Sequence, residues 1–106
     1  MRTITHNKLV RDKIPQIIEQ AGKSCIYETL PDNQYFQMLN KKLLEEVTEY
    51  LESGTVEELA DIGEVLYAIL VFKNVSMEEY QKIRLDKRNA RGGFTERILL
   101  KEVIED

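Results

Sequence analysis

The chain has 106 residues, 42% of them hydrophobic and 32% charged, with only two prolines and five glycines. This size fits a single domain over residues 1–106, and the composition excludes disordered and collagen-like proteins. The formal net charge of −4 disfavours binding to nucleic-acid polymers. The chain has one cysteine, no apolar run typical of a signal peptide in residues 1–10 and no apolar run long enough to span a bilayer, so we expect a cytoplasmic protein without membrane contact.

A helix is the first predicted element, at residues 12–21. Asp12 can cap its N-terminus, Pro15 is tolerated in a first turn, and Gly22 can end it. The next run, residues 24–30, is short and rich in residue types that favour strands. We expect a strand there.

The two strongest helix signals follow one another along the chain. Apolar side chains recur at helical spacing over about residues 32–52, and a serine and a glycine end the run. Thr55 and Glu58 then match a capping box, in which each side chain bonds the backbone N–H of the other residue. This signature opens a second long helix that reaches about Lys73. The short connection predicts two antiparallel helices joined by a tight turn.

A further capping signature begins at Ser76 and predicts a helix to about Ala90, before a pair of glycines. The short apolar run 98–103 is expected to pair with residues 24–30 as a minor two-stranded β ribbon. The predicted fold class is therefore all-α, an antiparallel helical bundle built on the central helical hairpin. Because the second long helix is apolar on two faces, we expect a homodimer or a higher homo-oligomer to cover them.

Paired carboxylates on the hairpin helices are the candidate metal ligands. At about 100° per residue, Glu46 and Glu49 border the apolar stripe of the first long helix. Glu58 and Asp61 lie above an apolar strip of the second. Carboxylates buried there are costly without cations, and oxygen ligands of this kind suit Mg²⁺ or Mn²⁺. From spacing alone a solvated helix surface remains an equal alternative, because 19 acidic residues make such pairs common.

Two motifs in the hairpin resemble those of a known family. Residues 42–49, KLLEEVTE, and 57–61, EELAD, resemble the E-E-x-x-E and E-x-x-D signature of the MazG-type all-α nucleoside triphosphate pyrophosphohydrolases. The flanking residues 7–15, NKLVRDKIP, and 91–94, RGGF, resemble the phosphoribosyl-ATP pyrophosphohydrolase-like branch of that superfamily. The resemblance thus covers nearly the whole chain.

This resemblance implies a Mg²⁺-dependent hydrolase that cleaves a nucleoside or deoxynucleoside triphosphate between its α and β phosphates. The products are the monophosphate and pyrophosphate, and removal of damaged nucleotides is one role that this chemistry serves. By motif position, the resemblance assigns the metal ligands to Glu46, Glu49, Glu58 and Asp61. It makes Glu45 either an outer-shell group or the base that orients the attacking water.

Three groups of cations are candidates for binding the phosphates: Lys42, the N-terminal cluster of Lys8, Arg11 and Lys13, and the helix end with Lys87, Arg88 and Arg91. Each group has a surface alternative. Lys42 can instead pair with Glu46 one turn later, and cations at a helix end are favoured by the helix dipole. The choice of the N-terminal cluster depends on the resemblance.

Two other functions remain open at this point. One is a dedicated phosphoribosyl-ATP pyrophosphohydrolase of histidine biosynthesis, which shares the metal chemistry but differs in substrate. The other is a small helical dimerisation or regulatory module without catalytic activity. In that module the acidic side chains are solvated, and Mg²⁺ has no effect on stability.

Overall fold

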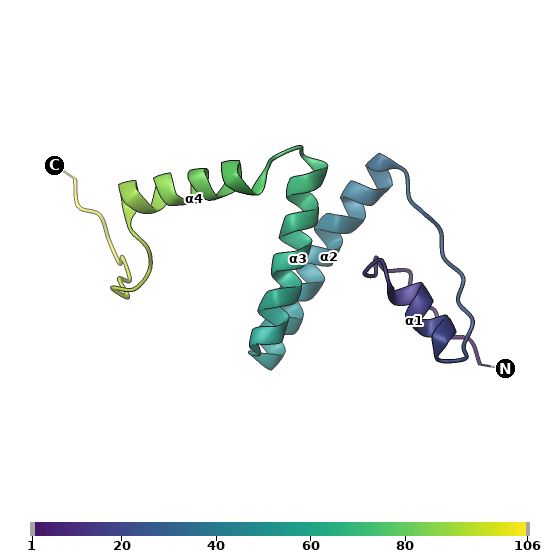
Figure 1. The fold of residues 1–106 in the computed structure, drawn as a ribbon. Coiled ribbons are helices and arrows are strands. Elements are labelled where there is room, and N and C mark those ends of the chain that lie inside the picture. The colour runs from purple at the N-terminus through teal and green to yellow at the C-terminus, as the bar shows by residue number, and fades with distance from the viewer. Residues whose placement is uncertain (1, 106) are drawn as a thin grey trace. The chain divides into compact units, whose positions relative to one another are not determined.

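Four helices make up the regular structure of the chain in the computed structural model, which describes residues 2–105 (Figure 1). They are α1 (Ile14–Gln20), α2 (Asp32–Ser53), α3 (Val56–Phe72) and α4 (Met77–Arg91). The chain divides into two units, Met1–Asn74 and Val75–Asp106. The predicted all-α class and the central helical hairpin are confirmed. None of the helices in the described part of the chain is long and apolar enough to cross a bilayer.

The expected β ribbon is wrong. Residues 24–30 and 98–103 are irregular, and no strand occurs between residues 2 and 105. Both runs are mostly exposed, with the side chains of Ile26 and Ile98 almost entirely in solvent. A β-prone composition stabilises a strand only when side chains pack on a neighbour, and two short strands alone are marginal in water.

The turn between α2 and α3 forms where the sequence predicts it. Gly54 ends α2 at φ 68°, a left-handed conformation that glycine adopts without strain, and its N–H donates to the carbonyl of Tyr50. The hydroxyl of Thr55 accepts from the N–H of Glu58 at 3.4 Å. The second half of the capping box is absent, because the N–H of Thr55 donates to the Ser53 hydroxyl instead. The Glu58 carboxylate is therefore free for another role.

The hairpin buries a narrow seam between α2 and α3. Leu39 of α2 and Val65 of α3 are its buried apolar residues. Of the two apolar faces of α3, the larger has Leu59, Ile62, Leu66, Ile69 and Leu70, and the smaller strip has Val65, Ala68 and Phe72. Val65 is buried, so the smaller strip faces α2. Leu59 and Leu66, on the larger apolar face, remain 47% and 37% exposed. The contact within the hairpin thus buries the smaller strip of α3 and covers the larger apolar face only in part, since Ile62, Ile69 and Leu70 are half-buried.

Aromatic side chains join the two helices at the end of the hairpin opposite the turn. The ring of Phe72 stacks on Phe36 with centroids 5.1 Å apart and meets Tyr35 edge-on at 5.8 Å. The Lys73 ammonium lies 4.9 Å from the centre of the Phe36 ring. These contacts hold the start of α2 against the end of α3, and so fix the register of the carboxylates between them.

The other two helices begin and end close to their predicted bounds. Pro15 lies in the first turn of α1 as expected, but Lys13 rather than Asp12 occupies the cap position, without a side-chain bond. The predicted cap at Asp12 is therefore wrong. At α4, the hydroxyl of Ser76 accepts from the N–H of Glu79 at 3.1 Å, which confirms the predicted cap. No residue of α4 is buried within the described residues.

Candidate metal centre

Glu46 lies at the centre of the carboxylate cluster. It is on the face of α2 that packs against α3, and its side chain is only 9% exposed. One oxygen, Oε1, lies 3.2 Å from the Lys42 ammonium. The other, Oε2, is buried and, when Glu49 is ionised, has no hydrogen-bond donor among the described residues. Oε2 of Glu58 is likewise buried without a donor. Buried carboxylate oxygens without a donor are costly, so this pair fits a site for a cation.

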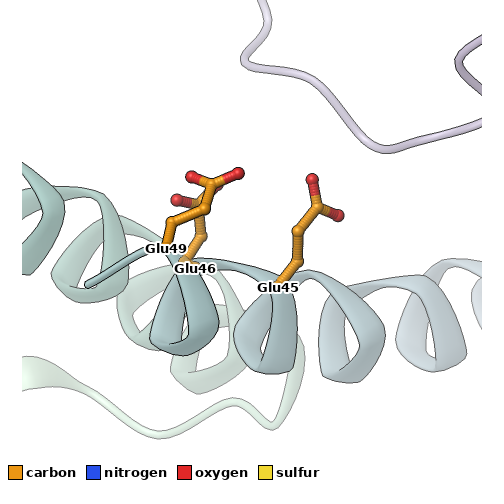
Figure 2. A group of neighbouring side chains, drawn as sticks. All are labelled: Glu45, Glu46 and Glu49. Atoms are coloured by element: carbon orange, nitrogen blue, oxygen red, sulfur yellow. The ribbon is translucent and has the colours of Figure 1, made fainter. Parts of the chain in front are cut away.

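The predicted ligands come together around Glu46. Oxygens of Glu45, Glu46 and Glu49 lie within 4.8 Å of one another, and all three side chains project from the same side of α2 (Figure 2). Across the hairpin, oxygens of Glu46, Glu58 and Asp61 lie equally close. Two groups of three carboxylates thus share Glu46. The hairpin therefore assembles the four predicted ligands and adds Glu45 to them.

Negative charge is crowded around Glu49. The carboxyl of Glu46 raises the pKa of Glu49, because a proton on Glu49 can be shared with it and the ionised form is repelled by it. Desolvation and the charge of Glu58 act in the same direction. A bound cation would remove this repulsion.

Glu45 and Lys42 form an ion pair that extends to the N-terminal segment. The Glu45 carboxylate lies 3.2 Å from the ammonium of Lys8 and 3.5 Å from that of Lys42. Burial alone would raise the pKa of Glu45, but the two ammonium groups outweigh it and lower this pKa. Burial alone would lower the pKa of Lys42, but Glu46 and Glu45 outweigh it and raise this pKa. Both groups are therefore held in their charged forms.

A second cation from the N-terminal segment reaches α3. The guanidinium of Arg11 lies 2.7 Å from Oδ1 of Asp61, and both side chains are partly exposed. Two of the three N-terminal cations, Lys8 and Arg11, thus contact carboxylates of the cluster. Lys13 is exposed and has no ion pair among residues 2–105. Lys87 and Arg91 belong to the other unit.

A pocket of about 420 Å³ adjoins the cluster, lined by Lys8, Lys41, Leu44, Glu45, Thr48 and Glu49. Lys41 and Thr48 were not expected at the site. The signal that could have found them is their spacing, because positions 41, 45 and 48 share one face of a helix. The Thr48 hydroxyl donates to the Leu44 carbonyl at 2.9 Å, which keeps its oxygen at the pocket wall.

Comparison with known proteins gives one significant relative. An uncharacterized protein of Mycolicibacterium smegmatis is 42% identical over 56 residues, which cover 53% of this chain and 57% of the relative. No protein-family profile matches the chain, and no solved structure is significantly similar. What the chain can do must therefore be argued from its own site.

Proposed function

We propose that this protein is a Mg²⁺-dependent nucleotide pyrophosphohydrolase that cleaves the α–β phosphoanhydride of a nucleoside triphosphate. The observation that carries the proposal is a pair of buried oxygens without hydrogen-bond donors, one on Glu46 and one on Glu58. Both residues belong to the two overlapping groups of three carboxylates that share Glu46. The choice of a nucleotide rests on the resemblance of residues 42–49 and 57–61 to the MazG-type enzymes.

The donor set fits Mg²⁺ better than other common metals. All the groups in the cluster are carboxylates, and Mg²⁺ and Mn²⁺ prefer such hard oxygen ligands. Glu46, Glu49, Glu58 and Asp61 would hold the ion. When bound, Mg²⁺ neutralises phosphate oxygens and lowers the pKa of a coordinated water.

The cations around the cluster are suited to hold a polyphosphate chain. Arg11 and Lys8 belong to the segment before α1, and their side chains are more than half exposed while they contact carboxylates. Each can therefore exchange a carboxylate oxygen for a phosphate oxygen without a large desolvation cost. Of the two roles expected for Glu45, its two ammonium partners favour the outer-shell role, in which it positions Lys8 and Lys42.

The exposed apolar side chains of α3 support assembly as a homodimer or larger oligomer. The side chains of α3 that remain 47% to 75% exposed include Val56, Leu59, Tyr67 and Val71. Contiguous exposed apolar surface on a helix is typical of an interface between subunits. Light scattering at micromolar concentration tests this point, and a monomer mass would refute it.

Release of pyrophosphate from a panel of nucleotides with Mg²⁺ tests the proposed activity. The panel contains the common ribo- and deoxynucleoside triphosphates, oxidised or deaminated analogues and phosphoribosyl-ATP. Asp61→Asn should abolish release, while Glu52→Gln, an exposed glutamate on α2 outside the cluster, should leave it unchanged. Activity on phosphoribosyl-ATP alone would favour the histidine-pathway enzyme. No release from any substrate, with no effect of Mg²⁺ on stability, would favour the non-enzymatic helical module.

A further inference from the structure

A second pocket lies in the unit formed by Val75–Asp106, at the C-terminal end of α4 and the turn that follows. Its volume is about 720 Å³, and its wall includes Arg84, Lys87, Arg88, Arg91, Gly93 and Phe94. Four of these six residues are cationic. The metal centre does not use this pocket, which belongs to the other unit of the chain.

The four cations form a single stripe along α4. Arg84, Lys87, Arg88 and Arg91 occupy positions i, i+3, i+4 and i+7, which share one face of a helix. Like charges at these spacings repel one another. Between residues 2 and 105, Lys87, Arg88 and Arg91 have no carboxylate within ion-pair distance, and the nearest acid along the helix, Asp86, pairs with Lys82. The helix dipole favours cations only in the last turn, so it does not account for Arg84.

The turn after α4 brings the chain back beside this stripe. Gly92 has φ 84° and ψ 176°, a backbone conformation that residues other than glycine rarely adopt. As a result, a Cβ on Gly93 would lie 4.0 Å from Nε of Arg88. Phe94 follows with 97% of its surface exposed, at the pocket wall. The turn thus adds an unpacked aromatic ring to a row of guanidinium and ammonium groups.

We propose that this pocket binds the di- or triphosphate group of a small molecule, and that it does so without a metal ion. Guanidinium groups bind phosphate oxygens in pairs, and three of the four stripe residues are arginines. The exposed ring of Phe94 offers a surface for a planar group attached to the phosphates. A nucleic-acid polymer fits less well, because the chain as a whole carries a net charge of −4.

The choice of a condensed phosphate over another polyanion rests on the proposed function, whereas the cationic pocket does not. The two sites differ in chemistry. The carboxylates of the hairpin hold the metal, and the stripe on α4 supplies positive charge that those carboxylates do not neutralise.

Titration of inorganic tripolyphosphate into the full chain in EDTA tests the proposal. Wild type should bind, and the double variant Arg88→Gln/Arg91→Gln should bind at least about tenfold more weakly, because two charge-assisted contacts are lost. Lys101→Gln is the control for net charge, since Lys101 is exposed in the same unit but does not line the pocket. It should bind within about twofold of wild type, as surface changes usually do. Circular dichroism checks that each variant keeps its helices.

Three results would overturn the proposal: no binding in EDTA, an equal loss in Lys101→Gln, or tighter binding of a short single-stranded RNA than of tripolyphosphate. The Asp61→Asn variant separates the two sites. It should bind tripolyphosphate in EDTA as wild type does, whatever happens to hydrolysis. Binding by a wild-type protein that hydrolyses nothing would refute the proposed function and support the anion pocket.

Discussion

Residues 45–64 and residues 82–91 carry opposite charges on helices that pack differently. The first segment contains eight acidic residues and no basic one, and the second contains five basic residues and one acidic one. In the hairpin, Glu46 is buried, and one of its carboxylate oxygens lacks a hydrogen-bond donor. On α4 no residue is buried, and the cations are exposed. Each segment thus concentrates charge of a single sign, but only the hairpin buries a charged residue.

The difference in burial matters for what each segment can bind. A buried, unpartnered carboxylate favours a small cation that enters the protein. Exposed arginines favour a larger anion that remains partly in solvent and is more sensitive to salt. The first segment therefore suits a metal ion and the second a polyphosphate, as the two proposals above require.

The largest effect should come from neutralising Glu58, the member of a pair of neighbouring glutamates that has a buried carboxylate oxygen. Glu57 and Glu58 both lie in the first turn of α3, so either substitution by glutamine loses the same favourable contact with the helix dipole. Of the two, only Glu58 belongs to the carboxylate cluster and has a buried oxygen there. Glu58→Gln should reduce pyrophosphate release by at least about 100-fold, since even outer-shell changes cost 10–100-fold. Glu57→Gln should stay within about twofold of wild type.

An equal loss in both variants would show that the helix dipole, and not the carboxylate cluster, explains the effect. Full activity in Glu58→Gln would remove α3 from the metal centre. Steady-state assays at saturating Mg²⁺ measure both outcomes.

Burial in the two segments can be compared directly through stability. Leu39 of α2 is 4% exposed and Ile83 of α4 is 55% exposed. Leu39→Ala should lower the free energy of unfolding by about 2–3 kcal/mol, the lower part of the range for buried leucines, because a hairpin seam can relax. Ile83→Ala should change it by less than about 0.5 kcal/mol. Urea unfolding at fixed protein concentration measures both. A large loss in Ile83→Ala would show that another surface covers α4 in solution.

Local signals predicted much of this fold, while contacts between distant residues were harder to infer. The bounds of α2, α3 and α4 follow from Gly54, Thr55 and Ser76, whose effects act within one helical turn. The β ribbon failed because strands depend on partners that composition does not specify. The capping box of Thr55 was half right, since the N–H of Thr55 donates to Ser53, and the Glu58 carboxylate lies with those of Glu46 and Asp61.

The candidate site shows the same division. Helical spacing was enough to predict that Glu46 lies near Glu49 on α2 and near Glu58 and Asp61 on α3. It could not place Arg11, which is fifty residues from Asp61 in the chain and reaches it through an irregular segment. That contact was anticipated only as a cation near the phosphates, through the family resemblance. The roles of these residues remain proposals.

Mg²⁺ should raise the free energy of unfolding by less than Leu39→Ala lowers it. At a Mg²⁺ concentration ten times its dissociation constant, the gain for wild type is about 1.4 kcal/mol, seen as a higher melting temperature. Glu58→Gln should lose this gain. In EDTA the same variant should be at least as stable as wild type, because in wild type the buried Glu58 oxygen has no hydrogen-bond donor. Sodium chloride at matched ionic strength controls for screening. An equal rise with sodium would mean that general screening explains the effect.

The smallest expected effect is a dependence of stability on pH that arises in the hairpin through Glu49. Its pKa in the folded protein is raised above the ordinary value of 4.5, because of the neighbouring Glu46 carboxyl. A carboxyl with a raised folded pKa contributes stability that is fully present below the unfolded pKa and is lost as pH rises through the folded pKa. Glu45 acts in the opposite direction, because its lowered pKa gives stability above 4.5 that is lost as pH falls.

Comparison of wild type with Glu49→Gln isolates the Glu49 contribution. In EDTA, the free energy of unfolding of the variant should rise relative to wild type as pH increases from about 4 to about 7, since only wild type loses a favourable proton there. Saturating Mg²⁺ should abolish this difference in slope, because a cation replaces the shared proton as the source of positive charge between the carboxylates. Urea unfolding at several pH values measures the slopes. A difference that stays flat or falls with pH would place Glu49 outside the carboxylate cluster.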